Sequence, residues 1–231
     1  MPTEETSKDL VRDISYNASN FLAYTKIIDS HCDFFEKSRI PHVKLRSRVE
    51  VENGALGVLK KLESGDTYIV KGGDLDFFIE EEGKWGQIGG NNVLSIYRKA
   101  LQKGVSIKVV GNFDPVRKHL TKAKEICEVL VQLGLKPKLA NHLLKTVFTR
   151  KVDGNISGLV WYNFSSHGDY FESDDPSIST YEGYFISSEK KECLPFLVSL
   201  EKALIEIEAG ATDYKIFLEK TENLFRNRRH I

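Results

Sequence analysis

The stretch that decides the fold is Ala100-Leu101-Gln102-Lys103-Gly104-Val105-Ser106-Ile107-Lys108-Val109-Val110. Its first half is helical in pattern and ends on a glycine, which readily adopts the left-handed conformation that closes a helix. Its second half is rich in β-branched residues, as strands are. Upstream, apolar residues recur at helical spacing from Val93 to Ala100, and Asn91 or Asn92 can cap the start of that helix. The stretch therefore predicts a helix that leads directly into a strand.

A similar helix and strand precede it. Apolar residues at helical spacing between residues 55 and 62 stop at Gly65, and residues 67–70 form a compact β-branched and aromatic run. Because each of the two strands follows a helix, we expect residues 67–70 and 105–110 to be parallel and central in one sheet. Before them, residues 42–49 alternate in period two, which predicts a short strand or an extended linker with a basic face formed by Lys44, Arg46 and Arg48.

The C-terminal half adds antiparallel strands. Asp114 followed by Pro115 predicts the start of a helix that reaches Gly134. Two strand-like runs, residues 144–152 and 156–164, are separated by a hairpin turn signal, Asp153-Gly154-Asn155. Residues 184–186 resume the sheet, residues 196–210 form a helix that ends at Gly210, and residues 214–225 form a last helix.

These elements predict an α/β fold: one mixed-sheet domain with helical extensions at both ends. The expected divisions are an N-terminal helical extension (residues 1–48, with an amphipathic helical pattern over residues 7–36), the α/β domain (residues 49–210) and a C-terminal helix (residues 211–231). Residues 72–86 and 165–180 have no period, so we expect long loops there. Loops of such length are often functional.

Composition places the protein in a broad class. With 41% hydrophobic and 29% charged residues in a 231-residue chain, a substantial core is expected and disorder is not. Basic and acidic residues number 33 each, so the whole chain has no electrostatic attraction to nucleic acid or to anionic membrane. The start lacks a signal-peptide pattern and no apolar run could span a bilayer, so we expect a cytoplasmic protein. Three distant cysteines, Cys32, Cys127 and Cys193, predict core thiols rather than disulfides or a zinc site.

The order of elements around residues 100–110 resembles the phospholipase D superfamily. The next strands contain Thr146, Phe148 and Asp153-Gly154, and the second of them ends in Asn163-Phe164-Ser165. Active members carry His-x-Lys-(x)4-Asp in the first of these strands, followed by Gly-Ser and Asn in the second. When Asp153 is set on the family's Asp, Thr146 stands in place of the nucleophilic His and Phe148 in place of the phosphate-holding Lys.

The catalytic residues of that family are therefore absent. A phosphodiesterase of this type needs an imidazole to form the phospho-enzyme and a cation to neutralise phosphate oxygens, and neither Thr nor Phe supplies these groups. The only His-x-Lys in the chain, His42-Val43-Lys44, precedes the predicted sheet and has Val49 where the motif requires Asp. We predict no catalytic residue, no cofactor and no metal ion. An acidic group, Asp74 and Asp76 with residues 80–82, is read as a solvated loop.

The chain thus resembles a catalytically silent phospholipase D-like domain, such as the ligand-sensing C-terminal domain of archaeal transcriptional regulators. The resemblance implies a non-catalytic sensory or regulatory domain in transcription regulation or signalling. It would bind a small polar ligand (sugar or nucleotide-like) and form a homodimer or bind a signalling protein, with no membrane partner. Two alternatives stay open. One is a diverged phosphodiesterase or metal-dependent nuclease that uses His167 and Asp169 or Asp74 and Asp76. The other is a nucleic-acid-associated factor that uses the basic residues of 44–48 and 226–230.

The ligand of an α/β sheet is expected outside the carboxyl ends of its strands, where loops from neighbouring strands meet. Residues 71–76 and 111–114 follow the two predicted parallel strands, and residues 163–169 follow the second strand of the hairpin. Their polar side chains offer several donors and acceptors for a hydroxylated or phosphorylated small molecule. The predicted ligand-binding residues are Lys71, Asp74, Asn112, Asp114, Asn163 and His167.

Overall fold

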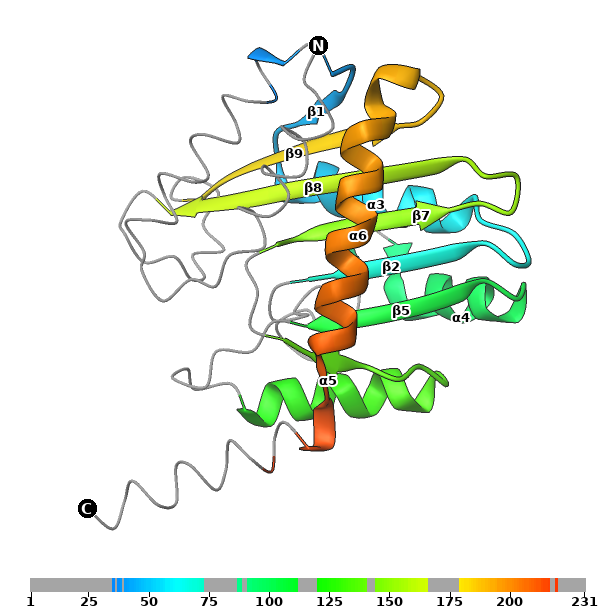
Figure 1. The fold of residues 1–231 in the computed structure, drawn as a ribbon. Helices are drawn as coiled ribbons and strands as arrows, with labels where there is room; N and C mark the ends of the chain where they lie inside the picture. Colours follow the sequence, from blue (N-terminus) through cyan, green and yellow to red (C-terminus); the bar gives the residue numbers. More distant parts are fainter. Residues whose placement is uncertain are drawn as a thin grey trace.

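A single eight-stranded sheet with helices on both faces forms the described part of the chain (Figure 1). The computed structural model describes residues 35, 37–38, 40–72, 87–88, 91–111, 120–140, 144–165, 179–216 and 219. The strands and helices in chain order are β1 (Val43–Leu45), α3 (Arg48–Lys60), β2 (Thr67–Lys71), β3 (Gln87–Ile88), β4 (Asn91–Asn92), α4 (Val93–Gln102), β5 (Ser106–Gly111), α5 (Leu120–Gln132), β6 (Lys138–Leu139), β7 (Thr146–Arg150), β8 (Ile156–Ser165), β9 (Ser179–Ser187), the short 3-10 helix η3 (Lys191–Cys193), α6 (Leu194–Gly210) and β10 (Thr212–Asp213).

The sheet is mixed, as predicted. Its strand order is β1-β9-β8-β7-β2-β5-β6-β10, while β3 and β4 form a separate two-stranded ribbon. Strands β2 and β5 are parallel neighbours near the centre, and β5 also pairs in parallel with β6. The other neighbours are antiparallel, including the predicted pair β7 and β8. The α/β fold class and the two parallel central strands predicted from the sequence are therefore confirmed.

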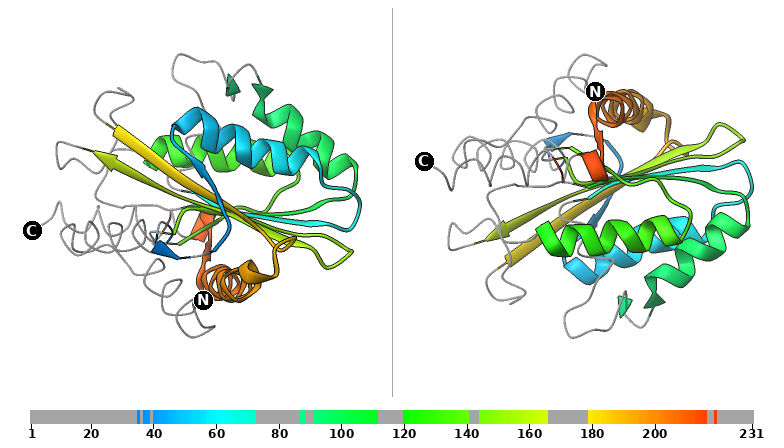
Figure 2. Two further views of the ribbon diagram at one scale, coloured as in Figure 1. Left: turned by 90° about the horizontal axis from the view of Figure 1, so that it is seen from above. Right: turned by 90° about the horizontal axis from the view of Figure 1, so that it is seen from below.

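The sheet separates two hydrophobic cores. Helix α6 crosses one face, whereas α3, α4 and α5 lie on the other (Figure 2). The core under α6 includes Phe148, Phe196 and Leu200, and the core under the three other helices includes Tyr68, Tyr97 and Val109. Neighbouring residues of β2 fill the two cores in turn: Tyr68 and Val70 belong to the core under α3, α4 and α5, and Ile69 belongs to the core under α6.

Several predicted helix and turn signals are present. The side chain of Asn92 accepts a hydrogen bond from the Ser95 amide at 2.8 Å and caps α4. After α4, Gly104 has a φ of +89°, and the next amide, that of Val105, donates back to the Ala100 carbonyl at 3.1 Å. In the β7–β8 turn, the Asp153 carboxylate accepts from the Asn155 amide at 2.9 Å. These local signals place the helix end and the hairpin where the sequence predicts them.

Helix α3 begins earlier than the sequence predicts. The alternation over residues 42–49 predicts extended chain, but the strand is limited to Val43–Leu45 and the helix begins at Arg48 rather than near residue 55. Ser47 Oγ accepts from the Glu50 amide at 3.2 Å, and Glu50 Oε2 accepts from the Arg46 amide at 2.6 Å. The first bond caps the helix, and the second ties Glu50 to the amide just before the cap. These local hydrogen bonds outweigh the period-two pattern.

The expected extensions are only partly described. Val43–Leu45, within the expected N-terminal extension of residues 1–48, is an edge strand of the sheet paired with β9. Most of the helical pattern at residues 7–36, the cap at Asp114 and Pro115, and much of the last helix lie outside the described residues. So do Cys32 and the greater part of both expected loops. Cys127 and Cys193 are buried free thiols, and burial raises the pKa of Cys127 to about 12. No helix in the described ranges is long and apolar enough to cross a membrane.

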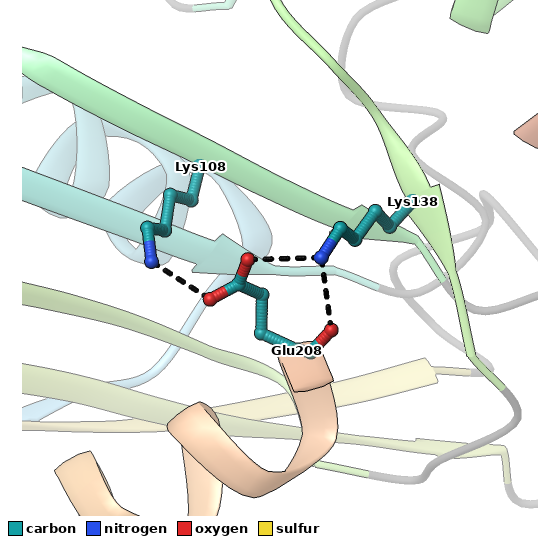
Figure 3. A network of polar contacts seen from close by, with 3 residues as sticks. All are labelled: Lys108, Lys138 and Glu208. Atoms are coloured by element: carbon teal, nitrogen blue, oxygen red, sulfur yellow. Dashed lines mark hydrogen bonds and ion pairs between the residues drawn. The ribbon is translucent and has the colours of Figure 1, made fainter. Parts of the chain in front are cut away.

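A polar clamp fixes the C-terminal end of α6 to the sheet (Figure 3). Glu208 Oε2 lies 2.7 Å from Lys108 Nζ on β5, and Glu208 Oε1 lies 3.1 Å from Lys138 Nζ on β6. Lys138 Nζ also donates to the Glu208 carbonyl at 3.2 Å. The hydrogen bonds from Lys108 and then Lys138 lower the pKa of the Glu208 carboxyl, against the opposing effect of partial burial.

This clamp predicts a pH-dependent contribution to stability. Because the Glu208 pKa is lower in the folded protein, its contribution is complete above the ordinary carboxyl range and is lost as the pH falls below about 4 to 5. At pH 7, Glu208→Gln should lower the free energy of unfolding by about 1 kcal/mol, since the pairs are partly exposed. Urea unfolding at pH 7 and at pH 3.5 checks this prediction. A difference between wild type and variant that is equally large at both pH values would contradict it.

Candidate ligand site at the carboxyl edge of the sheet

Strands from distant parts of the sequence begin or end along the same edge of the sheet. Strands β2, β5 and β6 are parallel, so their carboxyl ends lie together. Strand β7 is antiparallel to β2 and begins at that edge, where Thr146 pairs with Lys71. Strand β8 is antiparallel to β7 and therefore ends at the same edge, where β9 begins. We call this side of the sheet the carboxyl edge.

Lys71, the last residue of β2, is fully buried at the carboxyl edge. It lies between Val110 of β5 and Thr146 of β7 and belongs to the same sheet face as Ile69, which contributes to the core under α6. Lys71 Nζ donates to the Gly72 carbonyl at 3.0 Å. Burial of an ammonium group is costly unless it is hydrogen-bonded, so a lysine rarely occupies such a position.

The structure describes only part of the predicted site. Lys71 is at the expected edge, but it is the last residue of β2 rather than the first residue of the loop after it. Asp74, Asn112, Asp114 and His167 lie outside the described residues. Asn163 is in β8, where its backbone pairs with Tyr181, and its side chain is not described. The ligand set therefore stays a prediction, whereas the strand ends that precede these residues share one edge.

Tyr184 and Glu182 form a second polar group, which the sequence did not predict. Tyr184 of β9 pairs with Val160 of β8, which in turn pairs with Thr146, so Tyr184 lies in the same cross-sheet row as Lys71. Its hydroxyl donates to Glu182 Oε2 at 2.8 Å. Glu182 Oε1 lies 3.2 Å from Lys44 Nζ on β1. The alternation of Glu182 with Tyr184 was visible in the sequence, but the pairing of β9 with β1 was not.

The His42-Val43-Lys44 segment also differs from the prediction, which placed it before the sheet. Val43 and Lys44 are in β1 and pair with Phe185 and Tyr184 of β9. Pairing between strands about 140 residues apart (185 − 43 = 142) has no signature in the local sequence. The His42 ring packs edge-on against the Tyr184 ring, with centroids 5.3 Å apart, and its Nδ1 lies 2.8 Å from the Ile40 carbonyl.

Thr146 and Phe148, at the positions where an active phospholipase D would carry His and Lys, are both fully buried. Phe148 belongs to the hydrophobic core under α6, and Thr146 Oγ1 donates to the Val147 carbonyl at 3.3 Å. Phe148 therefore contributes to packing. Among the described residues, no group of three or more His, Cys, Asp or Glu could hold a metal ion, and Asp74, Asp76 and residues 80–82 lie outside that part of the chain.

No family model matches the sequence, and no curated protein matches it significantly. The structure is similar to Nuc, a phospholipase D family member from Salmonella typhimurium, with a TM-score of 0.46 and 9% identity over 75% of this chain and 97% of that chain. It is also similar to TrmBL2, an archaeal chromatin protein, with a TM-score of 0.44 and 11% identity over 83% of this chain and 61% of that chain. Both likenesses are in the arrangement of helices and strands, and no residue role is transferred from either protein.

Proposed function

We propose that this protein is a non-catalytic regulatory domain that binds a small polar ligand at the carboxyl edge of its sheet. The observation that supports the proposal is the fully buried Lys71, at the edge where the parallel strands β2, β5 and β6 end. A buried cation provides a fixed charge and several hydrogen-bond donors in a position that packing alone would fill with an apolar residue.

The remaining ligand contacts in this proposal come from the segments that continue from these strand ends. They are Asp74 after β2, Asn112 and Asp114 after β5, Asn163 near the end of β8 and His167 after it. Together with Lys71 they would bind a sugar-like or nucleotide-like molecule through several donors and acceptors. We also propose that the chain forms a dimer. This part of the proposal rests only on the resemblance to phospholipase D-like regulatory domains, and sedimentation velocity of the full chain tests it.

The test is a thermal-shift panel of glucose, ribose, AMP and inorganic phosphate. At a concentration near 100 times Kd, a ligand stabilises its protein by about 2.7 kcal/mol. For a chain of this size that corresponds to a rise in Tm of about 5 °C or more. We expect such a rise in the wild type and its loss in Lys71→Met. The matched control is Lys103→Met, because Lys103 follows α4 at the opposite edge and pairs with Glu63.

Two results would reject the proposed function. The first is a ligand-induced rise in Tm that is the same in Lys71→Met as in the wild type, because the site would then lie elsewhere. The second is turnover of bis-p-nitrophenyl phosphate by the purified chain that is lost on His167→Ala or Asp74→Asn. That result would identify the protein as an enzyme.

A further inference from the structure

Helix α4 presents cations to solvent and contains no acidic residue. Its buried residues belong to the core under α3, α4 and α5, and its exposed residues include Arg98, Lys99 and Gln102. The formal charge of α4 is +2, whereas α3 and α5 are neutral, with two cations and two acids each, and α6 is −2, with one cation and three acids. The first turn of a helix favours an acidic side chain, yet α4 has none there. The cations of α4 are therefore not balanced within the helix.

The end of α3 adds a further cation, Lys61, beside the end of α4. Lys103, which follows α4, donates from its Nζ to the Leu62 carbonyl at 3.4 Å and to Glu63 Oε1 at 2.8 Å. The end of α4 therefore lies on the turn that follows α3, next to the exposed Lys61. Lys103 and Glu63 neutralise each other, so the charge of this surface comes from the other cations.

Three cations and one amide thus share a surface at the ends of α3 and α4. Within the described ranges, none of the three cations forms an ion pair. Both helix ends lie at the same end of the sheet as the β7–β8 turn, opposite the carboxyl edge (Figure 1). We call this surface the basic face, and it consists of Lys61, Arg98, Lys99 and Gln102.

The side chains of the basic face suit a regularly charged polyanion. All four can donate hydrogen bonds, and none is apolar or aromatic. Lysine, arginine and glutamine are common partners of nucleic-acid phosphates, and such contacts do not depend on base sequence. Single strands are bound largely by stacking of bases on aromatic rings, and membrane surfaces by apolar anchors together with cations. The composition of the basic face therefore favours the backbone of a duplex.

We propose that the basic face binds the phosphate backbone of a nucleic-acid duplex. The equal numbers of basic and acidic residues in the chain do not oppose this binding, because charges farther away than about 8 Å are largely screened at physiological salt. The basic face differs from the two basic segments identified in the sequence. Lys44 of the first segment is paired with Glu182 at 3.2 Å, and residues 226–230 lie outside the described residues. The inference does not depend on Lys71 or on a ligand at the carboxyl edge.

Fluorescence anisotropy of a labelled DNA duplex, titrated with the full chain at several KCl concentrations, tests the proposal. Each contact between a cation and a phosphate releases counterions, so three contacts should give a slope of about −2.7 in a plot of log K against log salt concentration. Affinity should then fall about 40-fold between about 50 and 200 mM KCl. Arg98→Gln and Lys99→Gln should each reduce the steepness of this slope by about 0.9 and weaken binding about tenfold at about 50 mM KCl.

The matched control is Lys202→Gln. Lys202 is exposed on α6, across the sheet from α4, and its replacement changes the net charge by the same amount (Figure 2). It should leave both the affinity and the slope unchanged. All the replaced side chains are exposed, so the variants should unfold at nearly the same temperature as the wild type, which shows that the fold is retained. An RNA duplex of the same sequence should show the same dependence on Arg98 and Lys99, because the phosphates are common to both.

Four results would overturn the inference. The first is no binding of either duplex at about 50 mM KCl with protein up to about 100 µM, the weak end of the usual range for non-specific binding. The second is an equal loss of affinity in Lys202→Gln, because net charge and not the basic face would then decide binding. The third is tighter binding to a single strand than to either duplex, which would indicate stacking of bases elsewhere. The fourth is binding to phosphatidylserine vesicles, lost in Arg98→Gln and Lys99→Gln, without binding to a duplex.

Discussion

Replacing Phe148 by alanine should lower the free energy of unfolding by about 3 to 5 kcal/mol, the largest loss expected for any variant discussed here. Phe148 is fully buried in the core under α6 and pairs with Ile69 on one side and Gly158 on the other. The adjacent helix cannot move in to fill the space easily, because a Cβ atom at Gly158 would already lie 2.8 Å from Leu200 Cδ2. The ring therefore leaves a cavity that the surroundings cannot close.

Urea unfolding monitored by circular dichroism measures this loss. Ile205→Ala is the control, because Ile205 is on α6 but 53% exposed, and its replacement should change stability by about 0.5 kcal/mol. A loss below about 1 kcal/mol for Phe148→Ala would show that the core under α6 is not closely packed at this position. It would also contradict the assignment of Phe148 to that core.

Asp66→Ala should be the second most damaging change, with a loss of about 3 kcal/mol. Asp66 is buried at the start of β2, at the edge opposite the carboxyl edge. Its Oδ2 accepts from the Glu63 amide and its Oδ1 from the Val152 amide, both at 2.9 Å. One carboxylate thus joins the turn after α3 to the β7–β8 hairpin, and its removal leaves two amides without their acceptor.

The isosteric variant Asp66→Asn refines this prediction. An asparagine keeps one acceptor oxygen but places an NH2 group opposite the other amide, so the loss should fall between zero and that of alanine. Thermal unfolding of the three proteins gives the order wild type, then Asn, then Ala. Equal Tm values for wild type and Asp66→Ala would contradict the role of this carboxylate in joining the two turns.

The sequence predicted those parts of the fold that depend on local signals. Strand β2 is a mostly apolar run and β5 a half-apolar run, each after a helix end, and the β7–β8 hairpin has a clear turn sequence. The helix cap at Ser47 is equally local, but it was not predicted, because the alternation of residues 42–49 runs across it. The two-residue strands β6 and β10 are too short to produce any periodic signal, and they form only because a neighbour provides the pairing.

In the candidate site, too, only the residues marked by local sequence signals could be predicted. Lys71 was predicted because the residue that ends a central parallel strand can be identified from the sequence. Glu182 and Tyr184 could not be placed at the same edge, because their position depends on the register of β9 against both β8 and β1. That register is set by contacts between residues far apart in the chain. The short strand at residues 43–45 is among the two conformations predicted there, but its pairing with β9 could not be predicted for the same reason.

The pairing of β1 with β9 also has a consequence for the order of events during synthesis. Val43 leaves the ribosome long before its partner Phe185, so this edge of the sheet stays open while the residues between them are made. Closing a loop of that length is slow compared with forming the β7–β8 hairpin, whose paired residues are close in sequence. We therefore expect refolding in which the central strands gain protection first and the β1 corner last. A nascent chain that stops before β9 would expose the edge of β8 and be prone to aggregate.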